Sequence, residues 1–246
     1  MLLDERIGAG TRRFAVLGES LGHTWSPYIH NTLFAACGRD AVYLPITVPR
    51  DRLGSAVDVL RSCFDGFNVT IPYKERIMPL LDEIDDAARA CGAVNTVENR
   101  DGRLIGHITD GLGMLSALEK GGVQTHGVHA LILGGGGAAR IGVFLLTEIP
   151  GAYDVLINCT PVGMYPHTDA CPVNDCVITR CKAAFDAVYN PRTTQLLARA
   201  KALSIPTVEG LGMLFDQAIE AQRFWFGEVP PEAIQRDVLS ALKAKL

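Results

Sequence analysis

Residues 129–148 read HALILGGGGAARIGVFLLTE and carry the clearest indication of fold class in this chain. The apolar run 129–133 predicts a buried strand, the glycines predict a turn, and the apolar stretch up to Glu148 predicts a helix. The spacing Gly134-x-Gly136-x-x-Ala139 between strand and helix is typical of a Rossmann dinucleotide site, where glycines let the backbone approach a pyrophosphate. An ordinary structural turn is the alternative. We favour the nucleotide site because a strand and a helix flank the glycines.

The chain that follows this helix is too short for a complete Rossmann domain. A second strand is expected about 20 residues beyond the glycines, with a residue at its end that binds the ribose. Here Pro150-Gly151 predicts a turn, and the next strand, 153–158, leads directly into a proline-ended motif. About two strands and two helices are therefore missing. In a complete domain, the chain crosses from the first strand to a neighbouring strand on one side of it. Such crossovers are right-handed, so a chain that crosses to the strand on the other side puts its helix on the opposite face of the sheet. We expect weaker or altered binding of the cofactor.

The residues on both sides of this stretch alternate between strand-like and helix-like segments, which is typical of an α/β fold with a mainly parallel sheet. Ser26 and Pro27 predict the start of a helix, with Ser26 as its N-cap. Asp101-Gly102 predicts a hairpin turn. The predicted strands cover residues 13–18, 41–46, 67–71, 93–98, 104–108, 129–133, 153–158 and 183–188. The predicted helices cover residues 28–37, 50–63, 82–91, 112–120, 193–203, 211–226 and 231–246.

These segments predict two α/β domains. Residues 1–110 form a mainly parallel N-terminal domain, and the C-terminal helices, 214–246, pack back on it. Residues 111–213 form a truncated Rossmann-like domain that binds the nucleotide.

The composition excludes several classes of protein. Across 246 residues, 27 acidic and 23 basic side chains give a formal net charge of −4 without a basic run, which disfavours a nucleic-acid surface. No stretch approaches about 18 uninterrupted apolar residues, so we expect no membrane span. Asp4 and Glu5 lie where a secretory signal would be apolar, and we expect a cytoplasmic protein.

The cysteines and histidines do not predict a metal site. Seven cysteines are an odd number, which favours reduced thiols. The spacings of Cys171, Cys176 and Cys181 fit no common zinc pattern, and the histidines form no HExxH pair. We expect no metal.

Seven short motifs occur in order along almost the whole chain. They are GHTWSP at 22–27 with His30-Asn31, NVTIPYK at 68–74, GAVNT at 92–96, GHITD at 106–110, NCTPVGM at 158–164, DAVYNP at 186–191, and GLGML at 210–214 with Gln217. Together they resemble the shikimate dehydrogenase family. The resemblance implies an oxidoreductase that reversibly reduces 3-dehydroshikimate to shikimate with NADPH, in the biosynthesis of chorismate and the aromatic amino acids.

By this resemblance, Lys74 and Asp110 are the catalytic pair. Hydride addition to a ketone builds negative charge on oxygen and requires a nearby cation and proton donor, and oxidation requires the reverse. A lysine oriented by a carboxylate meets both demands. The alternative is a surface salt bridge worth about 0–1 kcal/mol. Lys74 follows the end of a predicted strand, where α/β sheets bind ligands, and we therefore favour catalysis.

The resemblance also implies which residues bind the two ligands. Short hydrogen-bonding side chains hold the substrate, with Thr24 and Ser26 on its carboxylate and Tyr189 closing the pocket. The substrate-binding residues are Thr24, Ser26, Thr70, Asn95, Tyr189 and Gln217. The cofactor-binding residues are Gly134, Gly135, Gly136, Gly137, Ala138, Ala139, Ala187 and Gly210. Individual polar residues among them could instead serve as caps or turns.

Three departures from the family pattern leave alternatives open. Thr24 replaces a serine, which makes quinate an alternative substrate. Ile108 replaces an asparagine beside Asp110 and removes a hydrogen bond worth about 0.5–1.5 kcal/mol. The shortened nucleotide domain makes two further functions possible: an NAD-dependent quinate/shikimate dehydrogenase, or a cofactor-deficient shikimate- or quinate-binding protein, as a sensor or relic. We expect a monomer or a homodimer.

Overall fold

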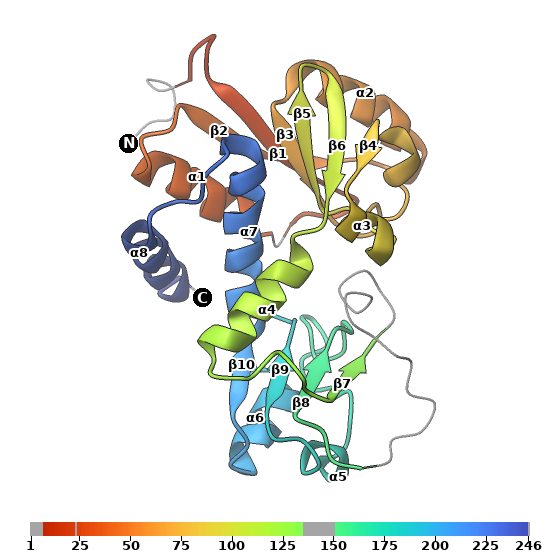
Figure 1. The fold of residues 1–246 in the computed structure, drawn as a ribbon, viewed down its shortest axis with the longest axis vertical. Coiled ribbons are helices and arrows are strands. Elements are labelled where there is room, and N and C mark those ends of the chain that lie inside the picture. Colours follow the sequence, from red (N-terminus) through yellow and green to blue (C-terminus); the bar gives the residue numbers. More distant parts are fainter. Residues whose placement is uncertain (1–6, 23, 135–150, 246) are drawn as a thin grey trace. The chain divides into compact units, whose positions relative to one another are not determined.

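The structure is a computed structural model that describes residues 7–22, 24–134 and 151–245. It divides into two compact units (Figure 1). Unit 1 comprises residues 1–109 and 218–246, and unit 2 comprises residues 110–217. The predicted turn Gly135–Ala139 and the predicted helix up to Glu148 lie outside the described residues.

Unit 1 contains a mixed sheet of six strands in the order β2-β1-β3-β5-β6-β4. β1 is parallel to its neighbours β2 and β3, and β4 is parallel to β6. β5 is antiparallel to both β3 and β6. The predicted hairpin around Asp101-Gly102 is confirmed as β5–β6. The strands are β1 (Arg12–Gly18), β2 (Ala41–Thr47), β3 (Gly66–Val69), β4 (Glu83–Ile84), β5 (Thr96–Arg100) and β6 (Arg103–His107).

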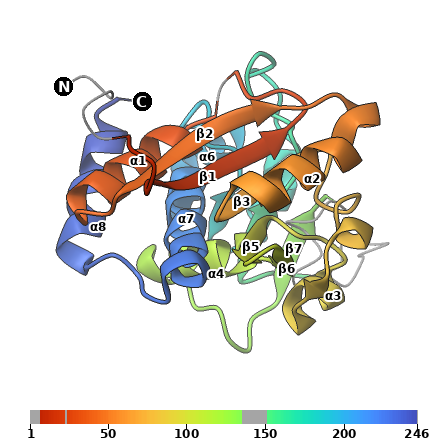
Figure 2. The same ribbon diagram turned by 90° about the horizontal axis from the view of Figure 1, so that it is seen from above.

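The helices of unit 1 come from both ends of the chain, and α1 and α8 lie side by side (Figures 1 and 2). The prediction of a helix over 82–91 is wrong in its first turn. Glu83 and Ile84 pair with β6 as a strand, and Asp85 starts the helix by accepting the Ala88 N–H at 2.7 Å. The helices are α1 (Ser26–Ala36), α2 (Leu53–Cys63), α3 (Asp86–Cys91), α8 (Glu232–Lys243) and the part of α7 (Gly210–Phe226) from Ala218 onward, with 3-10 turns η2 (Arg50–Arg52) and η3 (Met78–Leu80).

The core of unit 1 is an aromatic cluster over β1 and β2. Phe14 stacks on Trp225 of α7, with ring centroids 4.7 Å apart, and Phe34 and Tyr43 pack against the same group. The Trp225 indole donates to the carbonyl of Val97 at 3.0 Å. This contact holds α7 on the sheet.

Unit 2 contains four parallel strands in the order β10-β9-β8-β7. Along β8, alternate side chains pack on opposite faces: Val155 and Ile157 contact the residues of α4, and Leu156 contacts those of α6. Helices therefore cover both faces, as in a doubly wound α/β fold. The elements are α4 (Asp110–Lys120), β7 (Ala130–Leu133), β8 (Val155–Asn158), α5 (Asp175–Ile178), β9 (Ala184–Asp186), α6 (Gln195–Ala202) and β10 (Thr207–Glu209).

The sheet of unit 2 corresponds to half of a Rossmann sheet and the strand at its switch point. In the order 3-2-1-4-5-6, β7 takes the place of strand 1 and β8 to β10 take those of strands 4 to 6. Ala130 lies opposite Val155, so β7 pairs directly with β8. The 21 residues 134–154 between them suffice for one crossover, which needs a dozen or more, and not for two extra strands with their helices. This agrees with the truncated Rossmann-like unit that the sequence predicts.

In residues 7–22, 24–134 and 151–245, no helix has both the length and the apolar character that crossing a membrane requires.

Candidate active site

The topology of unit 1 gathers the predicted substrate residues at one edge of its sheet. Thr24 and Thr70 follow the carboxyl ends of the parallel strands β1 and β3. Because β5 runs antiparallel to β3, its amino end lies at the same edge, and Asn95 immediately precedes it. In α/β sheets this edge is where ligands bind.

The hydroxyl groups of Thr24 and Ser26 lie 3.3 Å apart at the start of α1. The prediction that Ser26 is the N-cap is wrong: Trp25 takes that position, and Ser26 is the first helical residue. The Trp25 side chain makes no capping bond, and Thr24 Oγ1 accepts the Ser26 N–H at 3.3 Å. Two hydroxyl donors at a helix amino end form an arrangement that suits an anion such as a carboxylate.

The loop after β3 is held between β1 and the residues before β5. The Thr70 N–H donates to the Leu17 carbonyl at 2.9 Å, and the Val94 N–H donates to the Lys74 carbonyl at 2.8 Å. Gly18 lets this loop approach β1 closely, because a Cβ on it would lie 2.7 Å from the Thr70 methyl group. The loop therefore brings Thr70 and half-buried Lys74 next to the segment that carries Asn95.

The side chain of Asn95 holds the residue that precedes Asp110. Its Oδ1 accepts the Thr109 N–H at 2.7 Å, and its Nδ2 donates to Thr109 Oγ1 at 3.0 Å. Both Asn95 and Thr109 are buried. Asn95 thus has a structural role as well as the predicted role in substrate binding.

In unit 2, Asp110 is the first residue of α4 and is 7% exposed. One turn later, a Cβ on Gly113 would lie 2.7 Å from the backbone nitrogen of Gln217 and 2.9 Å from its Cβ. Gln217 therefore packs against the face of α4 that carries Asp110, because residues three apart in a helix share a face.

The described cofactor candidates lie along the carboxyl edge of the unit 2 sheet. Gly134 follows β7, Ala187 follows β9, and Gly210 follows β10. A Cβ on Gly210 would lie 2.5 Å from the Asp186 carbonyl oxygen and 2.6 Å from that of Ala187, so this close approach requires glycine. Gly134 has a φ of +115°, which also favours glycine.

The side chain of Asp186 organises this edge, a role that was not predicted from the sequence. It accepts hydrogen bonds from Asn158 Nδ2 at 2.9 Å, the Val188 N–H at 3.0 Å and the Thr194 hydroxyl at 2.6 Å. Burial raises its pKa, against the effect of these three bonds. Asn158 is the first residue of the motif NCTPVGM, and Asp186 is the first residue of DAVYNP. Their membership of these motifs could have pointed to this structural role.

Tyr189, Cys159 and Cys181 of unit 2 are not ionised at neutral pH. Burial raises the pKa of Tyr189. Burial, followed by the charges of Asp186 and Asp110, raises the pKa of Cys159 to about 12, and burial raises that of Cys181 to about 11. Over the described ranges, no group of three or more His, Cys, Asp or Glu side chains is placed to hold a metal ion.

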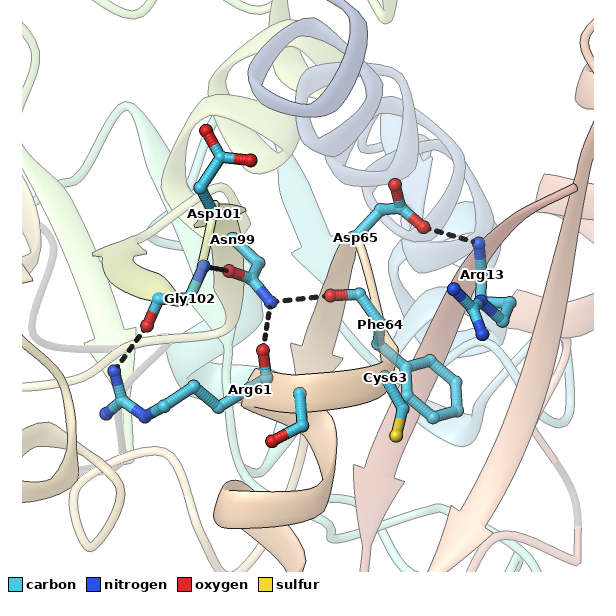
Figure 3. Close-up of a pocket in the computed structure, with 9 residues that line it drawn as sticks. Arg13, Arg61, Cys63, Phe64, Asp65, Asn99, Asp101 and Gly102 are labelled. Atoms are coloured by element: carbon cyan, nitrogen blue, oxygen red, sulfur yellow. Dashed lines mark hydrogen bonds between the residues drawn. The ribbon is translucent and has the colours of Figure 1, made fainter. Parts of the chain in front are cut away.

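A hollow at the opposite edge of the unit 1 sheet is distinct from this site (Figure 3). It lies between the start of β1 and the β5–β6 turn, where Asn99 donates to the carbonyls of Arg61 at 2.8 Å and Phe64 at 2.6 Å. Arg61 in turn donates to the Gly102 carbonyl at 2.7 Å. These bonds join α2 to the hairpin, so the residues have a structural role.

Comparison with known proteins identifies the family. A model of the shikimate dehydrogenase substrate binding domain matches residues 16–97. Shikimate dehydrogenase (NADP(+)) of Symbiobacterium thermophilum is 37% identical over 281 aligned positions, covering 95% of this chain and 96% of that protein. The chain belongs to the shikimate dehydrogenase family.

Solved structures of shikimate dehydrogenases have the same fold. A chorismate mutase/shikimate 5-dehydrogenase fusion protein from Clostridium acetobutylicum has a TM-score of 0.90 and 32% identity, covering 96% of this chain and 98% of that one. Shikimate 5-dehydrogenase from Thermus thermophilus, in complex with NADP(H) and shikimate, has a TM-score of 0.84 and 32% identity, covering 94% and 99%.

This member of the shikimate dehydrogenase family is shorter than its Symbiobacterium relative within the aligned region. The 281 aligned positions exceed the 246 residues of the chain, so the Symbiobacterium protein has residues inside the aligned region that this chain lacks. This agrees with the direct pairing of β7 with β8.

Proposed function

We infer that the protein is an NADP-dependent shikimate dehydrogenase, which reversibly reduces 3-dehydroshikimate to shikimate. The observation that carries this inference is the edge of unit 1 at which Thr24, Ser26, Thr70, Lys74 and Asn95 follow or precede neighbouring strands, in a chain that belongs to this family. Unit 1 binds the substrate and unit 2 binds the cofactor.

Binding of a small ring with one carboxylate and several hydroxyl groups requires short polar side chains. The paired hydroxyls of Thr24 and Ser26, 3.3 Å apart, donate to the two carboxylate oxygens. Thr70, Asn95 and Gln217 bind ring hydroxyls. Tyr189 covers the ring as an uncharged phenol, since burial raises its pKa.

Lys74 and Asp110 carry the acid–base chemistry. In the direction of ketone reduction, the Lys74 ammonium stabilises the negative charge that develops on the carbonyl oxygen and gives it a proton. In the reverse direction, the amine takes the proton of the alcohol. Asp110 orients the Lys74 amino group for this proton transfer.

The cofactor fits part of unit 2. Gly210 approaches the backbone of Asp186 and Ala187 closely, and Gly134 has a positive φ. Both positions favour glycine, which leaves the backbone at the carboxyl edge open to a cofactor. Gly210 and Ala187 would hold the nicotinamide end, and the turn beginning at Gly134 would hold the pyrophosphate. When bound, NADPH supplies the hydride.

A second candidate is a dehydrogenase that accepts NAD as readily as NADP. It is favoured by the direct pairing of β7 with β8, because the group that distinguishes the two cofactors ordinarily lies at the end of a strand on the other side of β7. A binding protein without a cofactor is the third possibility.

One set of measurements separates these functions. NADP+, NAD+ and shikimate are titrated separately by calorimetry, and oxidation of shikimate and of quinate is assayed with each nucleotide. Oxidation of shikimate with NADP+ supports the main proposal, and similar rates with both nucleotides support the second. Shikimate binding without oxidation by either nucleotide identifies a binding protein. We also propose a cytoplasmic location and a monomer or homodimer. Sedimentation analysis of the purified protein tests the oligomeric state.

A further inference from the structure

A chain of buried polar side chains lies behind Asn95, and no step of the proposed chemistry uses it. The Tyr43 hydroxyl donates to Asn68 Oδ1 at 2.6 Å, and Asn68 Nδ2 donates to Thr96 Oγ1 at 3.0 Å. Thr96 Oγ1 lies 3.1 Å from Thr109 Oγ1. All these residues are at least nine-tenths buried, and all belong to unit 1.

Chemistry determines the direction of these bonds. A backbone N–H can only donate, so the Asn95 atom 2.7 Å from the Thr109 nitrogen is the amide oxygen. Asn68 Nδ2 also donates to the Asn95 carbonyl at 3.1 Å, so the amide nitrogen of Asn68 faces β5 and its oxygen faces Tyr43. Thr96 Oγ1 accepts from Asn68 and directs its one proton towards Thr109 or Asn95. Turning either amide over would leave buried polar groups unmatched, which is costly.

The far end of the chain is anchored on α1 and β2. The Tyr43 ring stacks on His30, with centroids 4.3 Å and planes 14° apart, and the Tyr43 N–H donates to Asn31 Oδ1 at 2.8 Å. His30 is fully buried, and burial lowers its pKa to about 3, so it packs as a neutral ring. Tyr43 therefore has a fixed place from which to orient Asn68.

We propose that Tyr43, Asn68 and Thr96 are positioning residues that hold the Asn95 amide and, through it, the Thr109 peptide immediately before Asp110. Thr109 ends the first stretch of unit 1, and Asp110 is the first residue of unit 2. The backbone that carries the carboxylate is thus held by unit 1 up to the residue before it. This assignment rests on the proposed function, in which Asp110 is catalytic.

The expected size of the effect follows from the precision that catalysis requires. A displacement of about 1 Å in a catalytic group can cost about 100-fold in rate. Thr96→Val replaces the hydroxyl with a methyl group of similar volume and removes the link between Asn68 and Thr109. We expect kcat for shikimate oxidation to fall about 10- to 100-fold.

Two further variants separate positioning from a general loss of stability. Thr96→Ser retains the hydroxyl and is expected to restore kcat to within about twofold of the parent. Thr11→Val is a matched control: Thr11 is 5% exposed, lies in unit 1, and donates to Asp40 at 2.7 Å. It makes the same chemical change away from the site, and we expect kcat to remain within about twofold of the parent.

A second measurement does not depend on turnover. The exchange rate of the Thr109 amide proton, followed by NMR, reports its bond to Asn95. We expect about tenfold faster exchange in Thr96→Val and parental exchange in Thr96→Ser and Thr11→Val. Parental kcat and parental Thr109 exchange in Thr96→Val would overturn the proposal, as would an equal loss of kcat in Thr11→Val. Absence of turnover in the parent, with faster exchange in Thr96→Val, contradicts the proposed function and leaves the hydrogen-bond chain established.

Discussion

Lys74 is the residue on which the proposed chemistry depends most directly. It follows β3, and its carbonyl accepts the Val94 N–H at 2.8 Å, a bond that holds its backbone. We expect Lys74→Ala to lower kcat for shikimate oxidation by about 10²- to 10⁴-fold, the usual contribution of acid–base catalysis. The midpoint of urea unfolding should not change. Lys243→Ala, at an exposed position of α8, is the control, and near-normal turnover in Lys74→Ala would remove Lys74 from the mechanism.

His30 gives the stability of the protein a specific dependence on pH. Burial lowers its pKa to about 3, against an ordinary value of 6.5, so between these values the unfolded chain binds the proton and the native protein does not. Stability from this group is complete above the unfolded pKa and decreases as pH falls towards 3, by up to about 1.4 kcal/mol per pH unit.

Replacing His30 tests this dependence. His30→Phe retains the ring that stacks on Tyr43 and removes the titrating group. Urea unfolding between about pH 7 and pH 4 should show a smaller loss of stability in this variant than in the parent. His126→Gln, which removes an exposed imidazole, should keep the parental slope, and a parental slope in His30→Phe would contradict the assignment.

At the scale of single residues, the sequence predicted which side chains gather at the unit 1 edge but not how they are bonded. Thr24, Thr70 and Asn95 were identified through short motifs, and motifs specify local chain. Tyr43 contacts Asn68 across 25 positions of sequence, and no local pattern carries that information. The hydrogen bond from the Ser26 N–H to Thr24 was missed for a different, local reason: both residues have hydroxyl groups that can accept at a helix start.

Among the elements, α7 depends on a glycine in the strand beneath it. A Cβ on Gly66 of β3 would lie 2.5 Å from the Trp225 indole nitrogen, which donates to Val97. We expect Gly66→Ala to destabilise the protein by about 1–3 kcal/mol, the usual cost of overpacking. Equilibrium urea unfolding measures it.

For a second glycine, Gly54, we expect the opposite change in stability on substitution by alanine. Gly54 lies in α2, and nothing is within 4 Å of the place where its Cβ would be. Gly54→Ala should therefore stabilise the protein by about 0.5–1 kcal/mol, because alanine loses less backbone entropy in a helix. If both variants shifted stability in the same direction, the close contact between β3 and α7 would not be the cause.

The elements themselves were largely predictable, because their apolar periodicity is strong. Three short elements are exceptions. The sequence predicted neither α5 nor β10, and it predicted a helix from residue 82 in the segment before α3, where β4 lies. Glu83 and Ile84 extend instead because β6 offers them a parallel partner, a tertiary interaction that overrides local preference.

For the molecule as a whole, the two ligands should leave separate footprints. At about 100 times its dissociation constant, a ligand adds about 2.7 kcal/mol to the opening free energy of the segments it holds, or about 100-fold in amide exchange. Shikimate should slow exchange at 68–74 and 93–96 in unit 1, and NADP+ should slow it beside Gly134, Ala187 and Gly210 in unit 2. Residues 99–102, at the opposite edge, are the internal control. Protection there by shikimate would contradict the proposed site.

The truncation of unit 2 was predictable from a count of residues, because a crossover and a strand each need a minimum length. The strand pairing in the structure shows which strands remain, because β7 lies directly beside β8. The sequence predicted the glycine turn by its spacing, whereas the support that Asp186 gives to the same edge arises from residues 28 positions apart, such as Asn158.

The order of the units along the chain has an evolutionary consequence. Unit 2 is inserted between two stretches of unit 1, and near its two ends Gly113 lies against Gln217. None of the strands in the six-stranded sheet belongs to the inserted residues. Deletions within unit 2 therefore leave the strand pairing of the six-stranded sheet in unit 1 intact. In evolution, unit 2 can be shortened while unit 1 continues to fold.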